Sequence, residues 1–225
     1  MSNREEPIQI VTELMENGSL DKYLKDHASR NNFLDEQIMI QMSIQVAQGM
    51  AYLEREGYVH RDLAARNVLV GSNHLCKVAD FGLAKPVIDE EVYERVNDMP
   101  KPIKWTAPEA FNDDYSSKSD VWSFGILLTE IVSHGQSPYP GIPNREILER
   151  VKNQGYRMTR ENTPTLSNCP EELHDIMMGC WKLEPLWCDD PCEDPGDRIE
   201  SVPASPPPSE WPPSVALEVE LLRSM

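Results

Sequence analysis

Three short motifs occur in this chain in a fixed order and limit what it can fold into. The first is HRDLAARN at residues 60–67, the second is DFG at residues 80–82, and the third is APE at residues 107–109. Eighteen residues separate the acidic members of the first two motifs, and 29 separate those of the second and third. A single DFG triplet occurs by chance, but three motifs at these intervals are hard to obtain by accident. We therefore expect one polar site built from loops that are distant in sequence.

Together the motifs resemble the phosphoryl-transfer machinery of a protein kinase. In that family Asp62 would hold the substrate hydroxyl and accept its proton, while Asn67 and Asp80 would bind Mg²⁺ on the phosphates of ATP. Carboxylate and amide oxygens suit this hard cation. The alternative is that Asp62 and Asp80 are solvated turn residues, as most isolated aspartates are. The recurrence of all three motifs favours the catalytic interpretation.

The segment between the first two motifs predicts a short β-hairpin. Two apolar runs, at residues 68–70 and 75–78, flank four turn-forming residues, GSNH. A hairpin would bring Asn67 back beside Asp80, as a shared metal site requires. In the family Leu69 would form the floor under the adenine ring. Ordinary core packing is the other interpretation of Leu69, and the two are compatible.

The first motif also resembles one class of kinase more than the other. Serine/threonine kinases usually carry a lysine two residues after the aspartate, where this chain has Ala64. The sequence AAR at residues 64–66 resembles the tyrosine kinase form, in which Arg66 would direct the phenolic hydroxyl. The resemblance to non-receptor tyrosine kinases of the Src, Frk and Brk group covers about residues 7 to 185. It implies transfer of the γ-phosphate of ATP to tyrosine in protein substrates.

Further binding roles follow from this resemblance. The stretch PIKWTAPE is similar to the tyrosine kinase substrate platform, with Pro102, Lys104 and Trp105 in it. On the nucleotide side, Thr12 would be the gatekeeper, and backbone groups of Glu13 and Met15 would bind adenine. Thr12 is also simply a residue that favours a strand.

Regulatory and structural roles are also implied. Tyr93 follows an acidic run and looks like an autophosphorylation site, whose phosphate Arg61 and Lys85 would bind. A solvated loop tyrosine is the alternative for Tyr93. The resemblance assigns structural roles to four more residues, namely His60, Phe81, Glu109 and Asp120. Of these, Asp120 would hold the catalytic-loop backbone, and Glu109 would pair with an arginine whose position is taken here by Cys188.

The resemblance implies a mainly helical fold, the large lobe of a kinase with a remnant strand of the small lobe and short catalytic-loop hairpins. Residues 1–18 would be the small-lobe remnant and hinge, with a strand at residues 8–13, and residues 19–185 the large lobe. Residues 186–225 are acidic and rich in proline and should be disordered.

Hydrophobic patterns predict the main helices of this lobe. One helix should start after Asp35 and end at Gly57. Residues 121–132 are apolar almost all round, which predicts a buried helix begun by Asp120. Two further helices are expected at residues 144–153 and 171–181.

Some family elements are missing from the printed sequence. No glycine-rich loop, strand lysine or helix glutamate precedes Asp62. Catalysis by this chain alone is therefore expected to be impaired. A non-catalytic, pseudokinase-like binding module and a partial gene product are the alternatives.

Composition limits the possible partners. The net charge of −17, from 21 basic and 38 acidic residues, argues against nucleic acid. No apolar run reaches the length of a membrane span, and five scattered cysteines suit a reducing, cytoplasmic location. Prolines at 206–208 and 212–213 would attract an SH3 or WW domain, although a plain disordered tail is the favoured interpretation.

Overall fold

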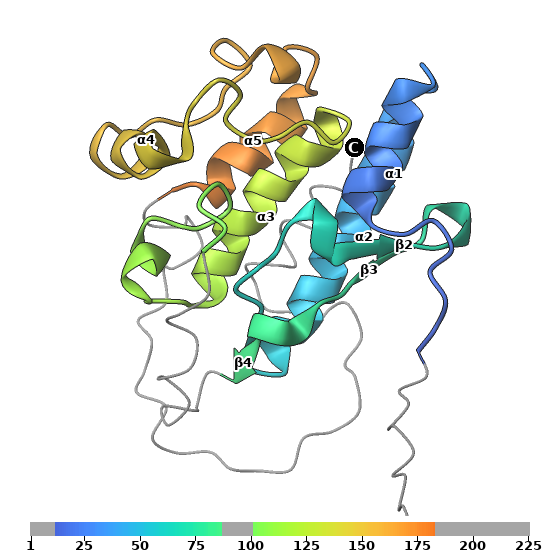
Figure 1. The fold of residues 1–225 in the computed structure, drawn as a ribbon, viewed down its shortest axis with the longest axis horizontal. Helices are drawn as coiled ribbons and strands as arrows, with labels where there is room; N and C mark the ends of the chain where they lie inside the picture. The colour runs from blue at the N-terminus through green and yellow to red at the C-terminus, as the bar shows by residue number, and fades with distance from the viewer. Residues whose placement is uncertain (1–11, 87–100, 183–225) are drawn as a thin grey trace, which may run out of the picture.

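The computed structural model describes residues 12–86 and 101–182 of the chain. Helices make up most of this part, and α3 packs against both α2 and α5 (Figure 1). The bounds are α1 Leu20–Ser29, α2 Glu36–Arg55, α3 Ser117–Val132, α4 Asn144–Leu148 and α5 Glu171–Cys180. The prediction of a mainly helical fold with short hairpins is confirmed.

Two short antiparallel sheets accompany the helices. Strands β2 (Val68–Val70) and β3 (Cys76–Val78) form the predicted hairpin, with Leu69 opposite Lys77. Strands β1 (Tyr58–Val59) and β4 (Lys85–Pro86) pair with each other across 25 intervening residues of chain. Short 3₁₀ turns occupy Ala65–Asn67, Ser72–His74, Phe81–Leu83, Glu109–Asn112 and Pro164–Leu166.

Helix α2 starts and ends as its sequence predicts. The Asp35 side chain accepts a hydrogen bond of 2.8 Å from the Ile38 N–H, which satisfies one of the free donors of the first turn. Gly57 follows the helix with φ +73°, and its N–H donates to the Glu54 carbonyl at 2.9 Å. Met42 and Val46 of this helix are fully buried, so it presents one face to the core.

Helix α3 forms the centre of the core. All but three of its sixteen residues are buried, as the continuous apolar run predicts. Ser116 caps the helix together with Ser119 in a capping box, so Asp120 lies in the first turn and does not begin the helix as predicted. A methyl group on Gly125 would lie 2.6 Å from the Trp181 indole nitrogen, which shows how closely α3 meets the residue after α5.

Three other predicted element boundaries also differ in the structure. The strand expected at residues 8–13 falls mostly outside the described residues, and Thr12 and Glu13 lie in no strand, because no described strand pairs with them. The helix expected at residues 144–153 is α-helical only to Leu148, and a π-helical turn continues it over Glu149–Asn153. The fifth helix ends one residue early, at Cys180. The predicted domains at residues 1–18 and 186–225 lie largely or wholly outside the described residues.

Candidate active site

The loop at residues 60–67 is anchored by a buried carboxylate on α3. Asp120 accepts hydrogen bonds from the His60 N–H at 2.6 Å and from the Arg61 N–H at 2.9 Å. These bonds hold Arg61 at φ +70°, a left-handed conformation that non-glycine residues rarely adopt. Burial raises the pKa of Asp120 to about 6, although both N–H donors favour its charged form. The side chain that the resemblance assigned to holding this loop does contact it.

The His60 ring joins the loop to the segment before Asp80. The Asp62 N–H donates to His60 Nδ1 at 3.3 Å, so Nδ1 is the acceptor nitrogen. His60 Nε2 therefore carries the ring hydrogen, and this N–H donates a hydrogen bond to the Ala79 carbonyl at 3.1 Å. The buried ring thus works as a fixed spacer between the two motifs.

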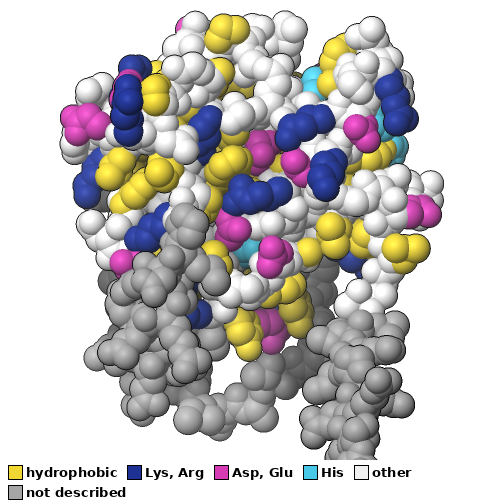
Figure 2. Space-filling model, in the orientation of Figure 1, with side chains coloured by type: hydrophobic (Ala, Val, Ile, Leu, Met, Phe, Trp, Pro, Cys, Tyr) yellow, Lys and Arg dark blue, Asp and Glu magenta, His cyan; other side chains and the backbone are white. Residues whose placement is uncertain are grey.

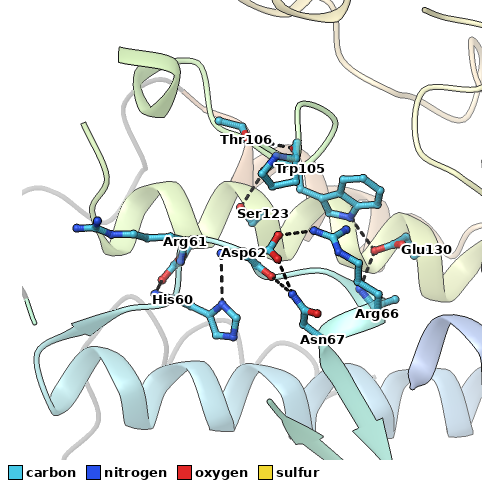
Figure 3. A network of polar contacts seen from close by, with 12 residues as sticks. His60, Arg61, Asp62, Arg66, Asn67, Trp105, Thr106, Ser123 and Glu130 are labelled. Carbon is cyan, nitrogen blue, oxygen red and sulfur yellow. Dashed lines mark hydrogen bonds and ion pairs between the residues drawn. The ribbon is translucent and has the colours of Figure 1, made fainter. Parts of the chain in front are cut away.

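The Asp62 carboxylate is held on both oxygens. Arg66 Nη2 donates to Oδ1, and Asn67 Nδ2 donates to Oδ2 at 2.8 Å and to the Asp62 carbonyl at 2.7 Å (Figure 3). The side chain remains 19% exposed. Its orientation is therefore fixed while one side stays open to a hydroxyl donor.

Asp80 directly follows Ala79, the residue that is hydrogen-bonded to Asn67. The Ala79 N–H donates to the Asn67 carbonyl at 2.8 Å, continuing the hairpin beyond β3. Asp80 has left-handed backbone angles, φ +61° and ψ +66°, and is exposed. No group of three or more His, Cys, Asp or Glu side chains able to hold a metal occurs among residues 12–86 and 101–182.

The donor set nevertheless suits Mg²⁺. The Asn67 side chain donates both of its hydrogen bonds from Nδ2, so its amide oxygen can bind a cation. Asp80 supplies an exposed carboxylate. Mg²⁺ is commonly held by one or two protein oxygens, with water and phosphate completing its octahedron. A carboxylate and an amide oxygen on two adjoining segments are therefore a donor set of the kind that this ion takes.

The segment at residues 102–106 is folded against the catalytic loop. The Trp105 N–H closes a turn onto the Pro102 carbonyl at 2.9 Å. The Trp105 ring lies under Arg66, whose guanidinium carbon is 4.5 Å from the ring centre. Lys104 is bound to the loop after α3 through Ser137 Oγ at 2.8 Å and the Pro138 carbonyl at 2.7 Å, and burial lowers the pKa of its ammonium group. The expected platform residues are thus brought to the edge of the site.

Glu130 is a site residue that the sequence reasoning missed. Its carboxylate, on α3, accepts hydrogen bonds from the Ala65 N–H at 2.9 Å and from Trp105 Nε1 at 2.8 Å (Figure 3). Burial raises its pKa. It is the one carboxylate within the apolar run at residues 121–132, and a charged residue in such a run is a signal that a partner is required.

Only some of the residues expected to bind the nucleotide lie close to one another. Val70 N–H donates to the Gly18 carbonyl at 2.8 Å, so the segment containing Met15 runs along β2 near Leu69. The Met15 side chain is half-buried against Gly71, and Leu69 is also half-buried. Thr12 and Glu13 are exposed, and Glu13 forms an ion pair with Lys77.

The remaining predicted residues are distributed around the loop. Arg61 lies over the Tyr115 ring, 5.2 Å from its centre, and Lys85 is buried opposite Val59. The Phe81 ring lies tilted against the His60 ring with ring centres 5.5 Å apart, and the residue is 50% exposed. Tyr93 and Cys188 lie outside the described residues, and Glu109 forms no ion pair within the part of the chain that is described.

The surface around the site carries charges of both signs. Figure 2 shows lysine and arginine side chains next to aspartate and glutamate side chains over the middle of this face, with apolar side chains among them.

In the described part, no helix has the length and apolarity needed to cross a lipid bilayer.

The catalytic loop holds a fixed carboxylate, and the segment at residues 102–106 packs against it. Comparison with known proteins shows which family carries this arrangement. The family model for protein tyrosine and serine/threonine kinases matches residues 1–186. The chain therefore belongs to the protein kinase family.

Two curated relatives are tyrosine kinases. Tyrosine-protein kinase SRK3 of Spongilla lacustris is 54% identical over 181 residues, which cover 80% of this chain and 52% of the relative. Human tyrosine-protein kinase FRK is 49% identical over 184 residues, which cover 80% of this chain and 35% of the relative. The chain thus spans about half of the first relative and about a third of the second.

Proposed function

We propose that this chain is the large lobe of a protein tyrosine kinase, whose reaction moves the γ-phosphoryl group of ATP to a tyrosine oxygen in a protein. One observation carries the proposal: Asp62 is fixed by Arg66 and Asn67 on a loop that Asp120 anchors. The identity to two tyrosine kinases supports the class of substrate.

Each site residue has a part in this reaction. Asp62 accepts the phenolic proton as the tyrosine oxygen bonds to phosphorus and the bond to the leaving ADP oxygen breaks. Arg66 and Asn67 keep the carboxylate oriented, and Trp105 with Pro102 supports the substrate ring. Asn67 and Asp80 would hold Mg²⁺, which when bound neutralises charge on the phosphates.

Three further assignments accompany the proposal. Thr12, Glu13, Met15 and Leu69 are proposed to line the adenine site. Arg61 and Lys85 are proposed to receive a phosphate on Tyr93. A cytoplasmic location and an SH3 or WW partner for the proline-rich tail rest on sequence composition alone.

The 225-residue chain by itself should turn over very slowly. Its printed sequence contains no glycine-rich loop, strand lysine or helix glutamate before Asp62, and these groups supply much of the electrostatic positioning in kinases. A purified-chain assay with Mg-ATP and a tyrosine copolymer tests this statement. We expect turnover near background. Robust turnover that Asp62→Asn abolishes would refute the impairment while supporting the catalytic assignment.

A non-catalytic role is the second candidate function. The platform is closed by a turn at residues 102–105 and packs on Arg66 of the catalytic loop, so the chain offers a surface for tyrosine-containing segments. Capture of tyrosine-containing peptides by the purified chain, with the same affinity in the presence and absence of Mg-ATP, supports a binding module. Failure to bind such peptides under both conditions argues against it.

A further inference from the structure

Glu130 carries a buried carboxylate that has no role in the proposed reaction. Its side chain is in the central helix, and the residue is 5% exposed. Two donors from segments 40 residues apart, the Ala65 N–H and the Trp105 indole N–H, end on the same oxygen, Oε2. One atom therefore joins the helix, the catalytic loop and the platform (Figure 3).

The contacts continue from Trp105 to the proposed base. The Arg66 guanidinium carbon lies 4.5 Å from the centre of the Trp105 ring, a favourable position for a cation on an aromatic face. The same guanidinium donates from Nη2 to Asp62 Oδ1. Because Ala65 directly precedes Arg66, Glu130 fixes this arginine from two sides, through its backbone and through the ring on which it lies.

We propose that Glu130 is a positioning residue that uses one carboxylate oxygen to hold Trp105 and the turn at residues 65–67, so that Arg66 keeps Asp62 directed at the substrate hydroxyl. The final step rests on the proposed function, because it assigns Asp62 to the hydroxyl. The link from Glu130 to Trp105 rests on the contacts alone.

Two conservative substitutions separate geometry from charge. Glu130→Gln keeps an oxygen at the same distance from the backbone, and that oxygen can accept both hydrogen bonds without a charge. Glu130→Asp keeps the charge, but its side chain is one methylene shorter and cannot reach both donors. If only the charge mattered, the Gln variant would be the damaged one. The proposal requires the opposite order.

The first readout is hydrogen exchange of the Trp105 indole N–H in the ¹⁵N-labelled full chain. Trp105→Phe identifies the signal by removing it. We expect Glu130→Asp to accelerate this exchange about tenfold or more, while Glu130→Gln stays close to the parent. Circular dichroism of each variant establishes that it is folded. Thr129→Val is the matched control, since Thr129 is buried beside Glu130 but donates only to the Ile126 carbonyl.

The second readout is the ratio of the dissociation constants of two peptides that differ only in a tyrosine or a phenylalanine. This ratio measures the hydrogen bond from the phenol to Asp62 and not the folding of the lobe. We expect the parent and Glu130→Gln to prefer tyrosine about tenfold, and Glu130→Asp to lose most of that preference, as Asp62→Ala does.

The outcomes distinguish the two proposals. Indole exchange that is unchanged in Glu130→Asp, or faster in Glu130→Gln than in Glu130→Asp, overturns the role of Glu130. A parent chain that binds both peptides equally, with the expected exchange results, contradicts the assignment of Asp62 to the hydroxyl. In that case the link between Glu130 and Trp105 still stands.

Discussion

At the scale of single residues, the loop that carries Asp62 depends on acids placed beneath it. Asp120 fixes the backbone on one side and Glu130 on the other, through the N–H groups of His60, Arg61 and Ala65. Both carboxylates are buried, so their ionisation is costly and their hydrogen bonds with N–H donors offset part of that cost.

The raised pKa of Asp120 makes stability depend on pH. A solvated aspartate has a pKa of 3.8, whereas burial raises the Asp120 value to about 6. Between these values the folded chain keeps a proton that the unfolded chain releases. Protonation of Asp120 therefore stabilises the folded state relative to the unfolded state. This stabilisation is complete below the lower pKa and is lost as the pH rises through the upper pKa.

We predict that Asp120→Asn reveals this contribution. Relative to the variant, the free energy of unfolding of the parent should fall by up to about 3 kcal/mol between about pH 4 and pH 7. Urea denaturation of both proteins across this range measures the difference. A difference that stays constant or grows with pH contradicts the prediction.

Some residues of the site could be predicted from the sequence, and others could not. Asp62, Asn67 and Asp80 lie in motifs of fixed spacing, and the hairpin between them could be predicted from its turn residues. Glu130 could not be placed, because its partners Ala65 and Trp105 depend on how α3 packs under two separate loops. Local pattern carries no information about such tertiary contacts.

At the scale of elements, a helix boundary that depends on a local hydrogen bond was easier to predict than one that depends on packing. Asp35 caps α2 through a local hydrogen bond that depends only on residues three apart. The end of α4 and its π-helical turn at residues 149–153 depend instead on surrounding packing. Sequence reasoning therefore placed the first boundary and missed the second.

The cap of α2 gives a direct prediction. Asp35→Ala removes the acceptor of the Ile38 N–H and should lower the free energy of unfolding by about 1 kcal/mol. Asp35→Asn keeps an acceptor and should change it by much less. Chemical denaturation of the three proteins gives the comparison. Equal losses in both variants would show that the cap itself is not the cause.

The contact between α3 and the end of α5 gives another prediction. Alanine normally stabilises a helix interior relative to glycine by about 1 kcal/mol. At Gly125 a methyl group would lie 2.6 Å from Trp181 Nε1 and 2.8 Å from Cys180 Cβ. We expect Gly125→Ala to destabilise the chain by about 1–3 kcal/mol, measured by thermal unfolding.

A second variant tests the cause of that loss. Trp181→Leu makes room beside Gly125, so the double variant should lose less stability than the sum of the two single variants. Additive losses would mean that the methyl group does not meet the indole.

At the scale of the whole molecule, the described residues form a helical core that carries the platform and the catalytic loop. The segment that contains Met15 runs along β2. The core helix α3 anchors the catalytic loop through Asp120 and Glu130, and it anchors the platform through Glu130. The chain spans only part of the length of its tyrosine kinase relatives.

The proposed phosphoryl transfer requires Asn67 and Asp80 to form one metal–nucleotide site beside Asp62. Titration of the ¹⁵N-labelled chain with Mn-ATP tests it, because the paramagnetic ion broadens the amide signals nearest to it. We predict that signals around Asn67 and Asp80 broaden first and that Asp80→Ala removes this effect. Broadening that begins in the acidic C-terminal residues and is unchanged by Asp80→Ala would contradict the claim.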